Sequence, residues 1–392
     1  MFSDPTPFTP PTTDDDKLSW LRLIRSRRVG PATFHRLIAE YGSARAALIA
    51  LPDIARAAGV EKYTICPEGV VYAEQKAGRA AGAQLICRGD PAYPKALAEI
   101  SDAPPVLWCK GDLSLLARPM VALVGARNAS SLGTRMARKL AEGLSAAGVV
   151  VVSGLARGVD AAAHAAAMEG GTVAVMAGGV NVIYPTENTA LADEIGKKGL
   201  RVSEQPMGQE PAARHFPLRN RIISGLATAV VVVEAAAQSG SLITARMALD
   251  QGREVFAVPG HPFDGRASGC NMLIRDGATL VRCVDDILAA LSLDARPNPQ
   301  LDLPLNNKAA APPPHATSPN TTSPSATSAD RPWRDQLALH RKILDRLGPS
   351  PIDEDQLLRD LALTPAEAAD EILALELAGS ISRAPGGLLS RS

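Results

Sequence analysis

Residues 121–130 read VALVGARNAS, and residues 149–164 read VVVVSGLARGVDAAAH. Each stretch joins a short, valine-rich run to a glycine-containing turn, and a segment of helical character follows. A valine-rich run without in–out alternation is typical of a strand that is buried on both faces of a parallel sheet. The two stretches therefore predict consecutive strand–turn–helix units, with both glycine turns at the carboxyl edge of one sheet.

The same pattern repeats over residues 104–292. It predicts a doubly wound, Rossmann-like α/β domain whose sheet is mostly parallel. Stretches rich in Ala and Gly between the strands are expected to form the covering helices, as at Leu132–Ala147 and Leu242–Gln251. The expected strands are Met120–Val124, Val149–Val152, Thr172–Met176, Ala229–Val233 and Glu254–Val258.

Changes of composition along the chain predict five regions. The second region has helical periodicity, and the link Val29–Pro31 between two of its helices resembles a helix-hairpin-helix turn. A small packing bundle is the alternative for that region. The predicted regions are a disordered leader (1–16), a helical SAM-like or helix-hairpin-helix-like domain (17–86), the Rossmann-like domain (87–296), a Pro/Ser/Thr-rich linker (297–332) and a C-terminal winged helix (333–392).

The chain has 392 residues with 41 Lys and Arg against 41 Asp and Glu, so its formal net charge at pH 7 is zero. Any basic binding surface must then be a local concentration of charge. The five cysteines are scattered without metal-ligand spacing, and no apolar run approaches the length of a membrane span. The N-terminus is unlike a signal peptide. We therefore expect a cytoplasmic protein without a structural metal.

The turn after the expected strand Met120–Val124 contains Gly125, Arg127, Asn128 and Ser130. It precedes a helix N-terminus, where free N–H groups and the helix dipole favour an anion. A dinucleotide fingerprint needs glycine at position 127, and no acidic residue ends the second strand to bind a ribose hydroxyl. These departures argue against NAD, and no cofactor is predicted. The planar fork of an arginine at position 127 suits a phosphate.

Three further segments are expected to bring polar groups to the same edge of the sheet, and the second and the fourth in chain order are glycine-containing turns. The second turn contributes Ser153, Gly154, Arg157 and Gly158, and Asp160 follows in the first helical turn. We interpret Asp160 as a helix cap or as a partner for an arginine. A fourth segment places Ser239, Gly240 and Ser241 at another helix start.

The third segment, RHFPLRNRIISGL at residues 214–226, gathers Arg219, Asn220 and Arg221 near Phe216. Arginines interleaved with an aromatic ring suit a single nucleic-acid strand, because the cations follow the backbone and the ring stacks on a base. The alternative is that these arginines form ion pairs with acidic residues such as Glu204 and Glu234.

Four segments that can each bind a phosphate lie at one edge of the predicted sheet. Together they would form a groove longer than a single nucleotide occupies. We therefore predict a single-stranded-DNA-binding surface without catalytic residues, since the GxxxxGK[ST] and GxSxG motifs are absent. His164 is interpreted as a packed or surface side chain, and Glu234 ends a strand without an identifiable catalytic partner. The candidate DNA-binding residues are Gly125, Arg127, Asn128, Ser130, Ser153, Gly154, Arg157, Gly158, Phe216, Arg219, Asn220, Arg221, Ser239, Gly240 and Ser241.

The expected recognition helix of the winged helix, TPAEAADEILALELAG at residues 364–379, has four acidic residues and no Lys or Arg. A helix that reads a DNA groove normally presents positive or amide side chains. We therefore favour a protein-contacting or regulatory role for this module. A transcription factor that uses the core as a ligand sensor is a competing hypothesis.

Colinear blocks between about residues 90 and 292 closely resemble the DprA/Smf family, the DNA-processing proteins of bacterial natural transformation. These blocks are VALVGARNAS, VVSGLARGVDAAAH, YPTEN, FPLRNRIISGL, VVVEAAAQSGSLITARMALDQGREVFAVPG and GCNMLIRDGA. The resemblance implies a protein that binds incoming single-stranded DNA, shields it and loads RecA recombinase onto it. The family's DNA contacts map to Gly125, Arg127, Ser153, Gly154, Arg157, Phe216, Arg219, Asn220 and Arg221.

The resemblance also implies a homodimer whose contact falls around Ile274 and Leu280, with buried core as the alternative for both residues. Relatives often carry Lys or Arg where YPTEN has Thr186, which puts a phosphate contact there in doubt. A nucleotide-processing enzyme remains the alternative function, because related Rossmann-like folds cleave nucleoside monophosphates. Loss of nucleotide turnover in a Glu234→Gln variant would favour that alternative.

Overall fold

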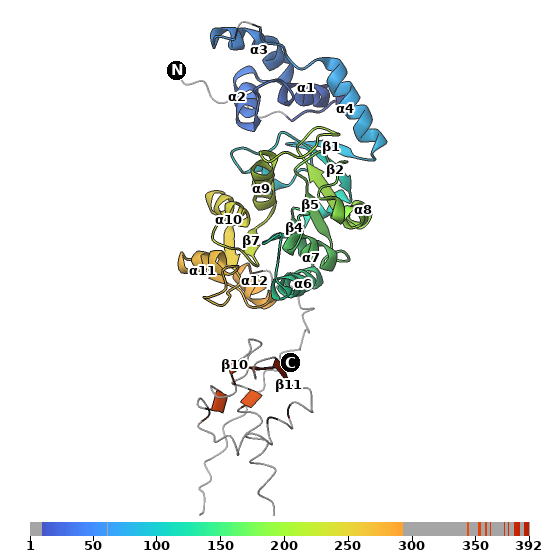
Figure 1. Cartoon of the computed structure of the whole chain (residues 1–392). Helices are drawn as coiled ribbons and strands as arrows, with labels where there is room; N and C mark the ends of the chain where they lie inside the picture. The colour runs from blue at the N-terminus through green and yellow to red at the C-terminus, as the bar shows by residue number, and fades with distance from the viewer. Residues whose placement is uncertain are drawn as a thin grey trace, which may run out of the picture. The chain divides into compact units, whose positions relative to one another are not determined.

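The structure is a computed structural model, and it describes residues 10–60 and 62–292 together with parts of the region 343–391. Its contacts divide the chain into two units, Met1–Asp302 and Leu303–Ser392, which are described separately (Figure 1). The predicted linker (297–332) and most of the leader lie outside the described residues.

The first unit begins with a small helical domain. Its helix α1 starts at Asp14, three residues before the predicted domain start, because Thr13 and Asp16 form a capping box. The acidic first turn also suits the positive end of the helix dipole. Gly30 and Pro31 end the predicted helix-hairpin-helix link, with Gly30 as the N-cap of α2. The helices are α1 (Asp14–Ile24), α2 (Pro31–Tyr41), α3 (Ala44–Ala57) and α4 (Glu68–Ala80).

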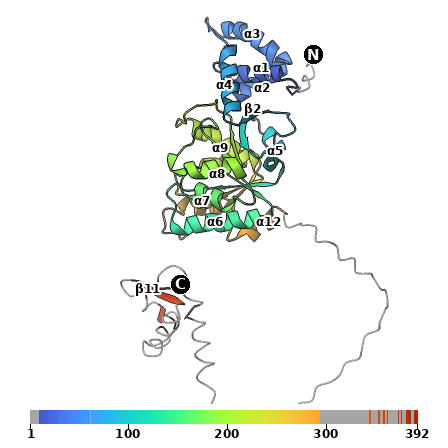
Figure 2. The ribbon, with the colours of Figure 1, turned by 90° about the vertical axis from the view of Figure 1, so that its right-hand side faces the viewer.

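A buried polar cluster joins this helical domain to the sheet. The carboxylate of Glu74 on α4 accepts a hydrogen bond of 2.7 Å from the indole Nε1 of Trp108 and forms an ion pair of 2.9 Å with Arg25. All three side chains are largely buried, so the pair is well shielded from water. Figures 1 and 2 show the four helices beside strands β1 (Gln84–Cys87) and β2 (Val106–Gly111).

The sheet of the first unit has nine strands in the order β1-β2-β6-β5-β4-β3-β7-β8-β9. Strand β2 pairs antiparallel with β1 and β6, and every other pairing is parallel. This arrangement confirms the predicted fold class. The remaining strands are β3 (Met120–Val124), β4 (Val150–Ser153), β5 (Thr172–Val175), β6 (Leu200–Ser203), β7 (Ala229–Val232), β8 (Glu254–Ala257) and β9 (Thr279–Leu280).

Helices cover both faces of the sheet. Along β3, Ala122 faces a core shared with α9 and α10, whereas Leu123 faces the core shared with α6, α7 and α12. In the described part of the chain, no helix is long and apolar enough to cross a membrane. The helices and 3₁₀ turns are α5 (Lys95–Ala98), η1 (Leu113–Ala117), α6 (Ser131–Ala146), α7 (Val159–Ala166), η2 (Thr186–Asn188), α8 (Thr189–Lys198), α9 (His215–Leu226), α10 (Ser241–Asp250), α11 (Ser268–Arg275) and α12 (Val284–Ala290).

The order of the strands creates a switch point beside β3. From β3 the chain moves through β4 and β5 to β6 on one side, and it then returns to β7 and β8 on the other side. In open α/β sheets, ligands bind outside the carboxyl ends of the strands at such a point. The fold therefore directs attention to the loops after β3, β4 and β7.

The second unit contains a three-stranded antiparallel sheet in the order β10-β12-β11. The strands are β10 (Ile352–Asp353), β11 (Ile381–Ala384) and β12 (Leu388–Arg391). Strands β11 and β12 pair antiparallel, as expected for the wing of the predicted winged helix. Buried Leu357, Ile372, Leu375 and Leu389 form part of a small core. Most of the expected recognition helix lies outside the described residues.

Candidate nucleic-acid interface

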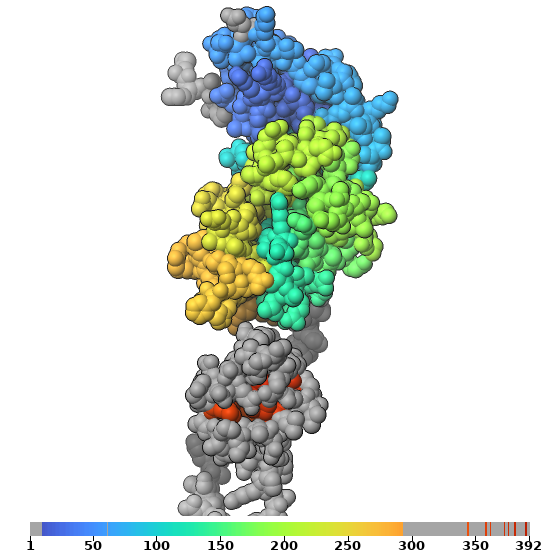
Figure 3. Space-filling view, viewed as in Figure 1, coloured from blue at the N-terminus to red at the C-terminus, as the bar shows by residue number. Residues whose placement is uncertain are grey.

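The loops at the switch point enclose a groove of about 670 Å³, here called the main groove. A side pocket of about 280 Å³ adjoins it and shares Arg127, Ala156, Phe216 and Arg219 with its lining. The segments that build them are far apart in sequence, and Figure 3 shows the teal, green and yellow parts of the chain meeting on one face. The predicted residues that line these hollows are Gly125, Arg127, Asn128, Gly154, Arg157, Phe216, Arg219, Asn220, Ser239, Gly240 and Ser241.

The segment at residues 214–226 forms helix α9 rather than a loop. Phe216, Arg219 and Asn220 are spaced i, i+3 and i+4, so they share one face of this helix and all line the main groove. Arg221 points elsewhere, and its buried guanidinium forms ion pairs with the buried Glu204 and with the partly exposed Asp102. The alternative of intramolecular ion pairing with Glu204 is therefore correct for Arg221, which does not line the groove.

Arg219 forms the floor between the groove and the pocket. Its side chain is buried, and its Nη1 donates to the carbonyl oxygen of Val175 at 2.9 Å and to that of Gly154. A Cβ on residue 154 would overlap this guanidinium, so any larger residue there would force Arg219 to move. Burial lowers the pKa of Arg219 to about 10, and the nearby Asp160 carboxylate opposes that shift. Arg219 thus stays charged at neutral pH and holds the β4 and β5 loop ends together.

Asp160 organises the turn after β4. Its buried carboxylate accepts hydrogen bonds from the backbone N–H groups of Gly154, at 3.1 Å, and Ala156, at 3.3 Å. Burial raises the pKa of Asp160, while Arg219 lowers it. Asp160 is therefore not the cap of α7, whose N-cap is Gly158 without a side-chain hydrogen bond. It organises the preceding turn, and the effect of Arg219 on its pKa agrees with the other interpretation, that it is a partner for an arginine.

The half-buried ring of Phe216 is surrounded by cationic and aromatic groups. The guanidinium carbon of Arg127 lies 5.0 Å from the ring centroid, and that of Arg219 lies 6.0 Å from it. The exposed ring of Tyr184 lies 5.8 Å away, centroid to centroid. Sequence reasoning missed Tyr184 as a site residue, although an aromatic side chain in the YPTEN block is a signal that could have identified it.

The rim of the side pocket carries both signs of charge. Arg157 forms an exposed ion pair of 3.6 Å with Glu187, and Thr186 lines the pocket beside them. An exposed pair of this kind contributes little to stability, so Arg157 can exchange Glu187 for a phosphate at small cost. At the other end of the main groove, the hydroxyls of Ser239 and Ser241 share a hydrogen bond of 2.7 Å.

Three more predicted residues lie behind the groove rather than in it. The Ser153 hydroxyl donates to the Leu123 carbonyl oxygen at 2.7 Å, because residue 153 still belongs to the buried strand β4. Gly158 has a φ of 73°, and a Cβ there would overlap the Ala126 carbonyl oxygen. Ser130 caps helix α6 through the N–H of Gly133. These residues shape the loops, and none of them lines either hollow.

The two residues that were weighed for catalysis are engaged in structural contacts. The Glu234 carboxylate accepts hydrogen bonds from the Ser130 N–H, at 2.9 Å, and from its hydroxyl. His164 is fully buried, its Nδ1 lies 2.7 Å from the Thr172 hydroxyl, and burial lowers its pKa to about 3. His164 is therefore a packed side chain, as the sequence suggests. Glu234 braces the loop after β3.

The two predicted dimer residues have different surroundings. Ile274 on α11 is half-buried and packs against the core beneath that helix. Leu280 in the edge strand β9 is 41% exposed. Leu280 is thus free to contact another chain, whereas Ile274 is partly used within this one.

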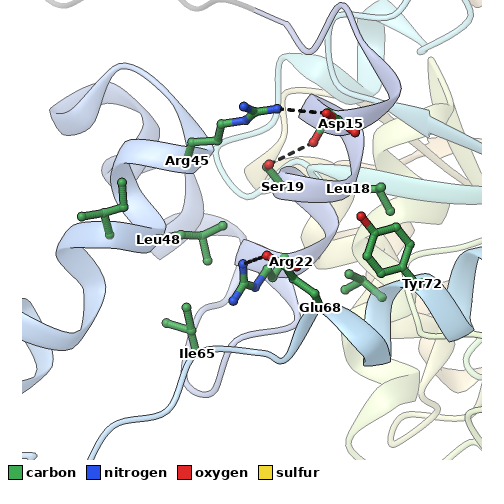
Figure 4. Close-up of a pocket in the computed structure, with 11 residues that line it drawn as sticks. Asp15, Leu18, Ser19, Arg22, Arg45, Leu48, Ile65, Glu68 and Tyr72 are labelled. Atoms are coloured by element: carbon green, nitrogen blue, oxygen red, sulfur yellow. Dashed lines mark hydrogen bonds and ion pairs between the residues drawn. The ribbon is translucent and has the colours of Figure 1, made fainter.

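A separate pocket of about 400 Å³ lies in the helical domain. Figure 4 shows its charged side chains paired with one another, Arg45 with Asp15 and Arg22 with Glu68. Leu48, Ile65 and Tyr72 supply much of the remaining lining.

The fold and the groove define a Rossmann-type protein with a groove lined by arginine, serine and glycine residues at the switch point of its sheet. The family of DNA recombination-mediator protein A matches residues 84–292, more than half of the chain. The DprA-like N-terminal HHH domain matches residues 14–77, and the DprA winged helix domain matches residues 309–387. The chain therefore belongs to the DprA/Smf family, which confirms the resemblance seen in the sequence.

Individual relatives agree with this assignment. DNA processing protein DprA of Streptococcus pneumoniae is 48% identical over 202 residues, which cover 51% of this chain and 71% of that protein. Protein Smf of Escherichia coli is 39% identical over 306 residues, which cover 77% of this chain and 76% of that protein.

Two solved structures are also similar. The X-ray structure of DprA from Streptococcus pneumoniae has a TM-score of 0.59 at 39% identity and covers 69% of this chain and 97% of that one. DNA processing protein A of Helicobacter pylori has a TM-score of 0.50 at 30% identity, covering 54% and 96% of the two chains. That structure concerns a single-stranded DNA binding mode of the Helicobacter protein.

Proposed function

We propose that this chain binds incoming single-stranded DNA in the cytoplasm, shields it and loads RecA recombinase onto it. The observation that carries the proposal is the Phe216 ring with the guanidinium of Arg127 above it, at the junction of the main groove and the side pocket. A cation beside a stacking surface binds a nucleotide strand without reading its sequence. The single-stranded DNA binding of the Helicobacter protein supports the same assignment.

The length of the lined surface favours a strand over a mononucleotide. Residues from Thr186 in the side pocket to Ser239 in the main groove form one connected lining around Phe216 and Arg219. Glycine and serine turns give a backbone phosphate close access to N–H and hydroxyl donors. Binding without chemistry is the function we infer, because Glu234 and His164, the two groups considered for catalysis, serve structural roles.

Nuclease protection and RecA assembly test the two halves of this proposal. The full chain should protect a single-stranded oligonucleotide from digestion and should shorten the lag of RecA filament formation on that strand. An Arg127→Ala variant should lose both effects together. Protection without any effect on RecA assembly would contradict the loading role, and absence of protection would contradict the DNA-binding role.

We further propose a homodimer, in which Leu280 lies at the contact. The exposure of this leucine at the sheet edge supports the proposal, since an edge strand can pair with or pack against another chain. Sedimentation velocity of the wild type and of Leu280→Arg is the corresponding test. A dimer in the wild type and a monomer in the variant are expected, and equal masses would contradict the assignment.

A further inference from the structure

The loop that follows strand β8, residues 258–267, presents an aromatic side chain almost completely to solvent. Phe263 is 94% exposed, whereas large apolar side chains are usually at least partly covered. The ring of His261 lies beside it, with centroids 5.5 Å apart and planes tilted by 39°. The two rings are called the His261–Phe263 ring pair below.

The loop is held in this conformation by its own hydrogen bonds. Asn271 on α11 bonds Gly260 in both directions, through Oδ1 at 3.1 Å and Nδ2 at 3.0 Å. The Asp264 N–H donates to the His261 carbonyl oxygen at 2.9 Å, which closes the turn that carries Phe263. The backbone turn that carries Phe263 is therefore formed before any partner arrives, so little backbone entropy remains to be lost on binding.

This loop is continuous with the main groove. Arg266, in the same loop, lines the groove together with Gln238 and Ser239. The Ser268 hydroxyl accepts a hydrogen bond of 3.0 Å from the Ala237 N–H, which ties the loop to the turn after β7. Two residues lie between Phe263 and Arg266, so their Cα atoms lie within about 10 Å of each other. The ring pair thus belongs to a loop that also contributes a side chain to the lining of the main groove.

The chemistry of the loop favours a nucleobase over a protein surface. Within residues 258–267, Phe263 is the one large apolar side chain that is exposed, so the loop presents a single ring and not the broad apolar patch on which proteins dock. Arg266 is paired with Asp264 at 3.2 Å, so the loop is nearly neutral and offers a stacking surface instead of charge. Every base has an aromatic face that can stack on such a ring.

We propose that the His261–Phe263 ring pair is a second base-stacking platform, which extends the single-stranded-DNA path beyond the end of the main groove. The inference rests on the proposed DNA-binding function and adds the place where the DNA strand leaves the main groove. The stacking platform predicts a particular salt dependence of DNA binding. Because stacking on Phe263 releases no counterions, its loss should lower affinity without changing the salt dependence of binding.

The test is a fluorescence-anisotropy titration of the full chain with oligo(dT) of increasing length at several salt concentrations. Phe263→Ala should weaken binding of long oligonucleotides about 5- to 100-fold, as expected for one lost stacking contact. Short oligonucleotides, which the groove accommodates by itself, should bind as before, and Phe263→Trp should retain the affinity for long ones. Tyr72→Ala, which removes a 53%-exposed aromatic ring in the helical domain, is the matched control and should bind normally.

Two results would overturn the platform. One is equal affinity of Phe263→Ala and the wild type for every length, with binding in the groove intact. The other is a change of oligomeric state in Phe263→Ala, measured by sedimentation without DNA, which would assign the ring to a second copy of the chain. Failure of the wild type to bind any oligonucleotide is distinguishable from both, because it would remove the groove function itself.

Discussion

Arg219 occupies the space that a side chain at position 154 would need, so these two residues are sterically matched across 65 positions of the chain. The guanidinium lies directly on the glycine and bonds to its carbonyl oxygen. A buried, positively charged floor is thereby placed beneath the point where the side pocket and the main groove join. The charge is held by the fold and is not carried on a mobile side chain.

Substitution of this glycine should disturb both stability and binding. Gly154→Ala forces Arg219 to move, and overpacking of this kind typically costs about 1–3 kcal/mol. Urea unfolding should show the loss, and affinity for oligo(dT) should fall with it. Gly240→Ala is the matched control for stability, because nothing lies within 4 Å of its added Cβ and its φ of −61° suits alanine. Equal destabilisation by the two substitutions would contradict the steric argument.

Removal of the floor charge should be more damaging than removal of an exposed arginine. Arg219→Met leaves the carbonyl oxygens of Gly154 and Val175 without this donor and leaves Asp160 uncompensated. Loss of these hydrogen bonds and of the cation near Asp160 should cost about 1–3 kcal/mol, because Asp160 keeps its two backbone donors. Adding Asp160→Asn to Arg219→Met should restore part of the stability, since it removes the unpaired charge. If the stability changes caused by Arg219→Met and Asp160→Asn simply add in the double variant, the two residues are not coupled.

A new cation at the rim should strengthen DNA binding. Thr186 lines the side pocket beside Arg157 and is exposed. Thr186→Lys adds a charge where a phosphate can reach it, so affinity for oligo(dT) at low salt should rise several-fold. The slope of log affinity against log salt should steepen by about 0.7 for one added contact. Thr186→Gln controls for side-chain size, and an equal gain with glutamine would argue against an electrostatic cause.

The buried imidazole predicts a specific pH dependence of stability. The pKa of His164 is lowered by burial to about 3, against about 6.5 in an unfolded chain. The unfolded state therefore binds the proton first as the pH falls. The contribution of the neutral side chain is complete above pH 6.5 and declines toward pH 3, by up to about 1.4 kcal/mol per pH unit.

His164→Gln isolates this effect from other titrating groups. The variant should be less stable than the wild type at pH 7.5, because it loses packing and the contact with Thr172. The difference between the two free energies of unfolding should then shrink at pH 6 and again at pH 5. Urea titrations at these pH values measure it. A difference that stays constant with pH would show that His164 is not held neutral by the fold.

The sequence predicted the centre of the fold well because the buried parallel strands leave a clear apolar signal. The expected strands at Met120–Val124 and Ala229–Val233 agree with β3 and β7 within one residue. Strands β2 and β6 were missed, and β6 contains Arg201, a charged residue that breaks the apolar pattern although it is buried. A strand that contains a charged residue can be assigned to the core only when the residues that surround the charge in three dimensions are known.

The site could be predicted at the level of segments but less well at the level of side chains. Clustered arginines near Phe216 located α9, yet only the helical spacing separates Arg219 and Asn220 from Arg221. Ser130 precedes helix α6 and Ser153 ends strand β4, and both side chains point into the protein, where they donate to the Glu234 carboxylate and to the Leu123 carbonyl oxygen. Such orientations depend on contacts between residues some 30 to 100 positions apart, which a linear pattern does not show.

The most direct test of the central account compares wild type with Arg127→Ala in salt-dependent binding. Labelled oligo(dT) and a duplex of the same length are titrated with the full chain between 50 and 200 mM salt, a range over which phosphate contacts lose affinity steeply. We predict that the wild type prefers the single strand and that Arg127→Ala binds it more weakly, with a salt slope shallower by about 0.7. Equal affinity for the duplex, or a slope and affinity unchanged by Arg127→Ala, would contradict a single-strand groove at this edge of the sheet.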